Sequence, residues 1–459
     1  MVTTPGEKTP VDLVVIGRAI LTMDDHYTLH EPGYLAIDNG VILGVGAADG
    51  EIPFRGKRLL HLPGHVITPG FINAHTHAPM TLFRGVADDL PLKEWLENHI
   101  WPLEARFVSP ESVFAGTLVA AAEMALAGVT CFADMYFAEE EVARAASRVG
   151  IRAMVSEGIL DFPTPLSPTI DDSFARARAT VEHFRAASPL SALYASVGPH
   201  SPYTCSEATL LRARDLALEF GVPLHIHLAE EKWEFDSFVA ERSMTPIAYL
   251  ESIGFFDGPQ VIAAHVNWTT DEDLAILAER RVGVAHNPRS NMKLATGVCR
   301  VPAMLDRGIT VALGTDGASS NNTLSVLDEA QMAARLHKIT AKDPTAVAAR
   351  QALAMATRGG AEALGLSAAL GTLEPGKAAD FVAFDFEKIH LTPVYDYYSH
   401  LIYAARASDI DYVYVAGKEI VARGRLTTIA SHEIAEVVGP HADAILDHVR
   451  AGSPKTSDP

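Results

Sequence analysis

The sequence predicts an α/β protein in which a (β/α)8 TIM-type barrel is inserted into a small β-sandwich domain formed by both ends of the chain. Between residues 68 and 370, short apolar runs alternate with longer segments whose apolar side chains recur at helical spacing. Before and after that region the chain consists of short β-type runs broken by turn signals such as Asn39-Gly40. With 459 residues, 48% of them hydrophobic, the chain is long enough for a barrel and a second domain.

The N-terminal part of the β-sandwich domain is expected over residues 1–67, with strands in the runs VDLVVIGRAILTM, YLAIDNGVILGVG and RLLHLPGHVITPG. The barrel is expected over residues 68–370, with strands at or near 66–75, 129–135, 151–157, 192–198, 222–228, 261–266, 282–286 and 309–316. A doubly wound open sheet is the alternative, but no GxGxxG motif follows the first strand. Residues 371–459 are expected to return to the β-sandwich domain, with 431–450 as a helix packed on the outside.

The charge balance argues against nucleic acid and membrane as partners. Lys and Arg number 37 against 57 Asp and Glu, so the formal charge is −20 and the surface repels polyanions. The chain has 3 Cys and no CxxC pair, which argues against a disulfide framework or a thiolate zinc site and suits a reducing compartment. No leader pattern opens the sequence and no run is long and apolar enough to span a bilayer, so we expect a cytoplasmic protein with loosely held polar ends.

Histidines and a carboxylate follow several of the expected barrel strands. His75 and His77 close the first strand as Asn-Ala-His-Thr-His, and residues two apart share one face of a strand. Taken alone, such a pair is equally well explained by surface histidines in a turn. His227, His265 and Asp316 end later strands, so their side chains are expected to meet at the barrel mouth, where active sites lie. Imidazole and carboxylate ligands without thiolate are typical of a zinc or iron centre that polarises water.

Four motifs in this order resemble the amidohydrolase superfamily, in particular its branch of nucleobase and nucleoside deaminases and triazine hydrolases: PGFINAHTHAPMTLFRG, HIHLAEE, GTDGASSNN and LEPGKAADFV. The resemblance implies the same barrel and β-sandwich architecture. It also implies that His75, His77, His227 and Asp316 hold one divalent metal ion per subunit, zinc being expected, with iron or manganese as alternatives. Dinuclear members bridge two metals with a carboxylated lysine on the fourth strand. That strand, ALYASVGPHSP, has no lysine here, which favours a single metal.

Within this branch the chain most resembles the deaminases of 5'-methylthioadenosine and S-adenosylhomocysteine, through RGVADDLPLKEWLENHIWPLEARF, GPHSPYTC and GTDGASSNN. The resemblance implies hydrolytic deamination of an adenine nucleoside to its 6-oxo product, with release of ammonia. Asp316 would take a proton from the metal-activated water, and His265 would orient the attacking oxygen. Glu230 would bind the base and protonate its ring nitrogen.

The same resemblance implies contacts with the rest of the nucleoside. Glu104 would accept hydrogen bonds from the ribose hydroxyls, His200 would contact the nucleoside, and Trp95 would form an apolar wall. Packing explanations stay open, because Trp95 could anchor a helix and Glu104 could pair with Arg106 or Arg84.

The loop after the third strand, LDFPTPLSPTIDD, contains no basic residue. Members that accept S-adenosylhomocysteine well are expected to present arginine to its amino-acid carboxylate from this region. We therefore expect an apolar 5' group such as methylthio, with Phe162 as a candidate wall, and keep S-adenosylhomocysteine and adenosine as alternatives.

Other functions on the same fold stay open at this point. A guanine or other free-base deaminase would share the metal site without needing Glu104 and Trp95 for a sugar, and a triazine-type amino- or chlorohydrolase would attack a similar ring. A catalytically inactive scaffold is expected to have lost ligands. A homodimer or tetramer is implied by the resemblance only. His225 is expected to be a hydrogen-bonded interior residue, while His286, placed near the site, and Glu157 have no assigned role.

Overall fold

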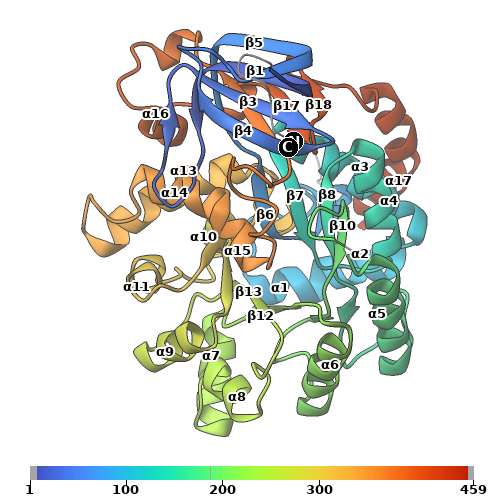
Figure 1. The fold of residues 1–459 in the computed structure, drawn as a ribbon. Coiled ribbons are helices and arrows are strands. Elements are labelled where there is room, and N and C mark those ends of the chain that lie inside the picture. Colours follow the sequence, from blue (N-terminus) through green and yellow to red (C-terminus); the bar gives the residue numbers. More distant parts are fainter. Residues whose placement is uncertain (1–7, 187, 453–459) are drawn as a thin grey trace, which may run out of the picture.

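The computed structural model describes residues 8–186 and 188–452 (Figure 1). Most of the two polar ends that we expected to be loosely held therefore lies outside the described residues. Of these ends, residues 1–10 and 451–459, Thr9 and Pro10 already belong to strand β1, Thr9–Leu21, and 451–452 belong to helix α17, Ser431–Gly452. No helix in the described ranges is long and apolar enough to cross a membrane.

Both ends of the chain contribute to one nine-stranded sheet, which Figure 1 shows in blue and orange-red at the top of the molecule. Its hydrogen-bonded order is β19-β18-β17-β16-β5-β1-β3-β4, with β2 added beside β1. The N-terminal strands after β1 are β2 Leu29–His30, β3 Gly33–Asp38, β4 Val41–Ala47 and β5 Phe54–Pro69. The C-terminal strands are β16 Phe381–Asp385, β17 Ile410–Val415, β18 Lys418–Ala422 and β19 Arg425–Leu426.

The two ends of the chain join where β16 runs antiparallel to β5, with Phe381 opposite Pro69. An isolated bridge between Val41 and Ala378 brings the edge strand β4 back toward the C-terminal half, so the continuous sheet curls over its own core. The rings of Phe381 and Tyr414 stack in that core at 4.5 Å. The expectation of a β domain built from both chain ends is confirmed.

The barrel strands follow in the expected order: β6 Phe71–Thr76, β7 Val129–Asp134, β8 Arg152–Val155, β10 Leu193–Ala195, β12 Leu224–Leu228, β13 Val261–His265, β14 Gly283–His286 and β15 Val311–Leu313. A short parallel pair, β9 Gly158–Ile159 and β11 Gly198–Pro199, continues the third and fourth of these positions. The ring closes where the Thr315 amide donates to the His75 carbonyl at 3.0 Å. The predicted (β/α)8 fold is confirmed.

The strands are shorter than the apolar runs that predicted them. The run 66–75 divides at Gly70, because its first part belongs to β5 and β6 begins at Phe71. A Cβ at Gly70 would lie 2.1 Å from Thr130 Oγ1, so the chain can approach β7 this closely only without a side chain. The run 309–316 contributes only Val311–Leu313, and Asp316 lies beyond the strand with a φ of 59°.

Helices cover the outside of the barrel (Figure 1). The longer helices are α3 Pro110–Leu126, α4 Glu139–Val149, α5 Ile170–Phe184, α6 Glu207–Phe220, α7 Lys232–Arg242, α9 Asp271–Glu279, α13 Val326–Ala341, α14 Ala349–Ala356 and α17 Ser431–Gly452. The shorter ones are α1 Leu92–Trp95, α2 Trp101–Phe107, α8 Pro246–Ser252, α10 Pro288–Lys293, α11 Val301–Asp306, α12 Ala318–Asn321, α15 Arg358–Ala363 and α16 Tyr397–Tyr403. A π turn, Leu96–Ile100, joins α1 to α2.

The C-terminal helix α17 lies against the barrel rather than the terminal sheet. It runs beside α3 in Figure 1, with Ile445 buried and the His448 ring 5.4 Å from that of Phe107. The helix covers the outside of the molecule, as its amphipathic sequence indicated.

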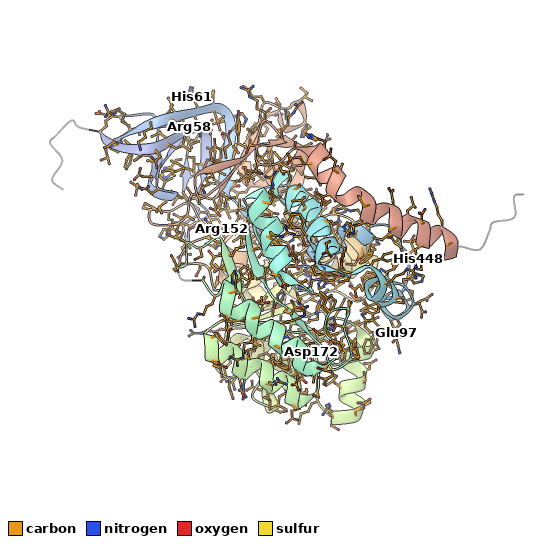
Figure 2. The ribbon with its side chains drawn as sticks, turned by 90° about the vertical axis from the view of Figure 1, so that its right-hand side faces the viewer. Arg58, His61, Glu97, Arg152, Asp172 and His448 are labelled. Atoms are coloured by element: carbon orange, nitrogen blue, oxygen red, sulfur yellow. The ribbon has the colours of Figure 1, made fainter. Side chains whose placement is uncertain are left out.

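A buried ion pair ties the barrel to the terminal sheet. Arg152 at the start of β8, labelled in Figure 2, donates from Nε and Nη2 to the two carboxylate oxygens of Asp380 at 2.8 and 3.0 Å. Asp380 directly precedes β16 and also accepts from the Ala416 amide. This bidentate contact anchors the end of the barrel opposite the site described next.

Candidate metal centre and active site

Four side chains from three separate segments of the chain converge at the mouth of the barrel. His77 Nε2 lies 3.2 Å from His227 Nε2 and 3.3 Å from Asp316 Oδ1. His75 Nε2 lies 3.6 Å from the same carboxylate oxygen. Ligand atoms of the three histidines all lie within 4.8 Å of one another. Three imidazole nitrogens and one carboxylate oxygen thus surround a single point.

The second nitrogen of each ring is engaged away from that point. His77 Nδ1 lies 2.6 Å from the Met135 carbonyl, and His227 Nδ1 lies 2.8 Å from the His200 carbonyl, so both nitrogens must carry a proton to donate. His75 Nδ1 lies 2.9 Å from His225 Nε2, another ring nitrogen. In neutral rings this arrangement leaves the Nε2 lone pairs of His77 and His227 free for a cation, which is the usual outer-shell support of metal-binding histidines.

The spacing of these atoms fits a small tetrahedral ion. With metal–ligand bonds of ~2.0–2.1 Å, neighbouring ligands of a tetrahedral zinc ion lie about 3.3 Å apart. The three separations of 3.2, 3.3 and 3.6 Å lie close to that value. His75 Nε2 is also buried without any hydrogen-bond partner, a cost that a bound cation would remove. The residues therefore suit a divalent metal.

Asp316 is held in place by two hydroxyls. Ser290 Oγ donates to its Oδ2 at 2.5 Å and Ser320 Oγ at 3.0 Å, which leaves Oδ1 directed at the histidines. Burial by itself would raise the pKa of Asp316, but its contacts with His75 and His77 hold that pKa well below the usual range. The carboxylate is therefore ionised at neutral pH.

The cluster as a whole favours one positive charge. Burial lowers the pKa of His75 to about 3 and that of His227 well below its usual range, so both imidazoles are neutral. His77 behaves differently, since burial opposes its protonation but the neighbouring Asp316 raises its pKa to about 9. Bound metal would supply at this point the positive charge that a proton on His77 otherwise supplies.

Glu230 follows β12 by two residues and lies at the edge of the cluster. Its carboxyl faces the cavity without a protein hydrogen-bond partner among the described residues, and the side chain of Glu234 accepts from its backbone amide at 2.9 Å. Burial first, and the nearby Asp316 second, raise the pKa of Glu230 well above its usual range. Burial therefore favours the protonated form of Glu230, whose carboxyl faces the cavity.

His265 ends β13 in backbone with a φ of 71°. Its Nδ1 lies 2.8 Å from Asn291 Oδ1 and 3.7 Å from Glu230 Oε1. Donation to the amide oxygen leaves Nε2 as an acceptor, and ligand atoms of His265, His75 and Asp316 form a second group within 4.8 Å. His265 therefore lies beside the proposed metal position, between it and Glu230.

A cavity of about 520 Å³ opens over this cluster. Every site residue predicted from the sequence faces this space except His75, which is fully buried behind it. The lining residues of that set are His77, Trp95, Glu104, His200, His227, Glu230, His265 and Asp316. Apolar side chains form the rest of the wall, among them Met80, Leu92, Leu96, Ile100, Trp101, Leu160, Phe162 and Leu294. No lysine or arginine is present among the described residues that line it.

Three lining residues have unused polar groups. The Trp95 indole N–H is buried without an acceptor among the described residues. Glu104 Oε1 accepts from the Tyr136 hydroxyl at 2.7 Å, which leaves Oε2 without a protein donor among the described residues. Burial raises the pKa of Glu104 to about 7. His200 Nδ1 lies 3.1 Å from Thr204 Oγ1, and burial lowers the pKa of His200 to about 3, so its ring is neutral. These groups can bind a polar ligand in an otherwise apolar cavity.

Several supporting residues were missed by sequence reasoning. Tyr136, which contacts Glu104, directly follows the expected strand 129–135, and its place at a strand end could have marked it as a site residue. Ser320 lies within the GTDGASSNN motif, while no pattern marked Ser290 or Asn291. Their roles depend on contacts with residues distant in the chain.

His225, His286 and Glu157, for which the sequence predicted no ligand role, are all held by contacts outside the cavity. His225 is buried and contacts His75, in agreement with the expected interior role. His286 had been placed near the site, but it does not line the cavity. Its Nε2 lies 3.1 Å from that of the buried His337. Glu157 accepts from the Ala138 and Glu139 amides at the start of α4 and is also absent from the lining.

Comparisons with known proteins agree with this geometry. The sequence profile of the Amidohydrolase family matches residues 66–420. A 5-methylthioadenosine/S-adenosylhomocysteine deaminase of Syntrophobacter fumaroxidans is 45% identical over 93% of this chain and 97% of its own. A 5'-deoxyadenosine deaminase of Methanosarcina acetivorans is 40% identical over 96% of this chain and 100% of its own. The crystal structure of an adenosine deaminase from Xanthomonas campestris with bound zinc superposes with a TM-score of 0.92 at 37% identity, covering 97% and 100% of the two chains. This chain belongs to the Amidohydrolase family.

Proposed function

We propose that this protein is a metal-dependent deaminase that hydrolyses an adenine nucleoside with a small neutral 5' substituent, such as 5'-methylthioadenosine, to its 6-oxo product and ammonia. The observation that carries the proposal is that two buried glutamates line one cavity: Glu230 lies beside the metal cluster, and Glu104 lies on α2. The first suits a ring nitrogen that must be protonated, and the second suits a sugar diol. The relatives named as nucleoside deaminases support the same assignment.

The proposed metal ligands are His75, His77, His227 and Asp316, and the proposed ion is a single zinc. A divalent ion at this place activates water as a nucleophile at neutral pH. Three imidazoles and a carboxylate also suit iron or manganese, so metal analysis of the purified protein decides the identity. One ion per chain is expected, and His227→Ala should lose it. Two ions per chain, or full activity without any, would contradict the assignment.

The reaction steps follow from the protonation states of the chain's own residues. Glu230 would donate its proton to the ring nitrogen next to the attacked carbon, which makes that carbon electrophilic. Asp316, ionised and held by Ser290 and Ser320, would accept the proton of the attacking water. His265, neutral because burial lowers its pKa, would orient the attacking oxygen through Nε2. Asp316 would then pass the water proton to the amine, so that ammonia leaves, and Glu230 would regain a proton from the added hydroxyl as the 6-oxo group forms.

The other end of the cavity is proposed to bind the sugar. Glu104 would accept from the ribose hydroxyls through Oε2, His200 would contact the nucleoside, and Trp95 would cover it. Trp95 would also donate its indole N–H to a ribose oxygen, because this N–H is buried and has no acceptor among the described residues.

The 5' group is proposed to be neutral. Trp101 and Phe162 lie with ring centroids 5.5 Å apart at the outer part of the lining, and no lysine or arginine is among the described residues that line the cavity. A carboxylate placed there would lose hydration without gaining a cationic partner. This disfavours S-adenosylhomocysteine, with its amino-acid tail, relative to 5'-methylthioadenosine and 5'-deoxyadenosine.

Ammonia release from a panel of compounds tests the proposal against its rivals. 5'-Methylthioadenosine should be turned over with a higher kcat/KM than S-adenosylhomocysteine, guanine or aminotriazines. Preferred turnover of guanine would favour a free-base deaminase, and preferred turnover of a triazine would favour a triazine hydrolase. A metal-loaded protein inactive on the whole panel would favour the inactive scaffold.

We also propose an oligomeric state, a cellular location and a domain division for this protein. A homodimer or tetramer is proposed from the family resemblance, and light scattering measures it. A cytoplasmic location is proposed from the cysteine usage, since Cys131, Cys205 and Cys299 are all free and buried. The domain division at 67/68 and 370/371 is proposed for the β domain and barrel, and limited proteolysis followed by mapping of the cuts tests it.

A further inference from the structure

We propose that Tyr136 is a positioning residue that ties the covering segment to the barrel through Glu104 and so orients the carboxylate for the ribose. The covering segment is defined as residues 91–107, comprising α1, the π turn and α2. This inference rests on the proposed nucleoside substrate. It adds a residue to which neither the sequence motifs nor the comparisons give a role.

The backbone of Tyr136 is fixed to the barrel from two directions. Its amide lies within hydrogen-bond distance of Glu139 Oε1 at 2.7 Å and of the Ser156 carbonyl at 3.3 Å. Its carbonyl accepts from the Gly158 amide at 2.7 Å. The ring packs against Phe137 with centroids 5.0 Å apart. Tyr136 is therefore a rigid support at the end of β7.

Glu104, in contrast, lies on a short helix that depends on outside contacts. The Tyr136 hydroxyl donates to Glu104 Oε1 at 2.7 Å, and both side chains are buried, with exposed fractions of 5% and 7%. Among the described residues this is the one side-chain hydrogen bond between the covering segment and the barrel. A helix of this length is marginal without tertiary contacts. Ile100 and Leu103 pack the covering segment into the core, and the bond from Tyr136 then fixes the direction of the Glu104 carboxylate.

The bond from Tyr136 occupies only one of the two carboxylate oxygens of Glu104. Oε1 is occupied by Tyr136, and Oε2 has no protein donor among the described residues, so Oε2 remains for the ligand. Burial raises the pKa of Glu104 to about 7, and donation from Tyr136 acts in the opposite direction. Tyr136 thus favours the ionised carboxylate, which accepts hydrogen bonds from two hydroxyls better than the acid does.

The test compares Tyr136→Phe with the wild type on two substrates, 5'-methylthioadenosine and its 2',3'-dideoxy analogue. The variant should raise KM for the parent about 5- to 20-fold, as expected for one charge-assisted hydrogen bond, while kcat changes less than about twofold. KM for the dideoxy analogue should change less than about twofold, because this analogue has no hydroxyl for Glu104. Tyr194→Phe is the matched control, since its hydroxyl donates to the Pro189 carbonyl outside the cavity.

A cycle with Glu104→Ala tests whether Tyr136 acts through Glu104. Adding Tyr136→Phe to that variant should leave KM for the parent unchanged within about twofold. Equal KM increases on both substrates, or additive effects in the cycle, would overturn the proposal while leaving the deaminase function in place. Absence of wild-type turnover on any nucleoside would instead reject the proposed function, and the inference about Tyr136 with it. If Tyr136→Phe fails to fold, the KM ratio of the two substrates in Tyr136→His and Glu104→Gln supplies the comparison, and an unchanged ratio in both overturns the proposal.

Discussion

Replacing Glu230 by glutamine removes the proton that the proposed reaction needs while keeping the shape of the side chain. Glu230 has an exposed fraction of 5%, and burial together with Asp316 raises its pKa well above the usual range. Its carboxyl has no protein hydrogen-bond partner among the described residues, so the substitution breaks no internal contact. An amide can donate a hydrogen bond to the ring nitrogen but cannot transfer a proton to it.

The expected effect follows from that single loss. General acid–base groups contribute ~10²–10⁴-fold, so kcat of Glu230→Gln should fall by about that factor. At ~1.36 kcal/mol per tenfold change, this corresponds to about 2.7–5.4 kcal/mol in the activation barrier. Metal content should be unchanged, because Glu230 is not one of the four proposed ligands and its carboxylate lies 3.7 Å from the ring of His265, which is not a proposed ligand either.

Steady-state ammonia release, with metal analysis of the same samples, measures both quantities. The matched control is Glu231→Gln, an adjacent glutamate at the start of α7 that does not line the cavity and should leave kcat within about twofold. Ammonia release near the wild-type rate from Glu230→Gln would refute the acid–base role. Loss of metal together with activity would show that Glu230 supports the metal instead.

Three further predictions concern specificity and stability. Phe162→Arg places a cation at the rim of the cavity and should raise kcat/KM for S-adenosylhomocysteine relative to 5'-methylthioadenosine by about tenfold, and an unchanged ratio would argue against this rim as the 5' site. Asp380→Asn leaves the buried Arg152 without its counter-charge and should lower the free energy of unfolding by about 3–5 kcal/mol in denaturant titrations, whereas a loss below about 1 kcal/mol would contradict a strong interdomain anchor. Burial raises the pKa of Glu329 to about 8, so its contribution to stability is complete below the unfolded pKa of ~4.3 and is lost as pH rises through 8. Glu329→Gln should therefore flatten the fall in unfolding free energy between pH 5 and 8.5, and equal slopes in both proteins would contradict the shift.

The sequence by itself was enough to predict the architecture and the place where the candidate metal ligands meet, while the choice of the four ligands came from the family resemblance. The architecture and the meeting place depend on local patterns: apolar periodicity distinguishes strands from helices, and the His75-Thr76-His77 spacing places two imidazoles on one face of a strand. The end of a parallel barrel strand is also a definite place, so His227 and Asp316 could be assigned to the same mouth without coordinates. The ligand roles stay predictions until metal is measured.

Only the tertiary structure decided how these side chains are held and which neighbours serve them. The contacts that orient the rings join residues far apart in the chain, as His75 and His225 do across 150 positions, and periodicity carries no signal for them. The same holds for Tyr136 beside Glu104 and for Ser290 beside Asp316. His286 shows the limit most clearly: it ends a strand as His265 does and as His227 nearly does, yet it pairs with His337 on α13. Which face of a four-residue strand points inward depends on the packing of its neighbours and not on its own sequence.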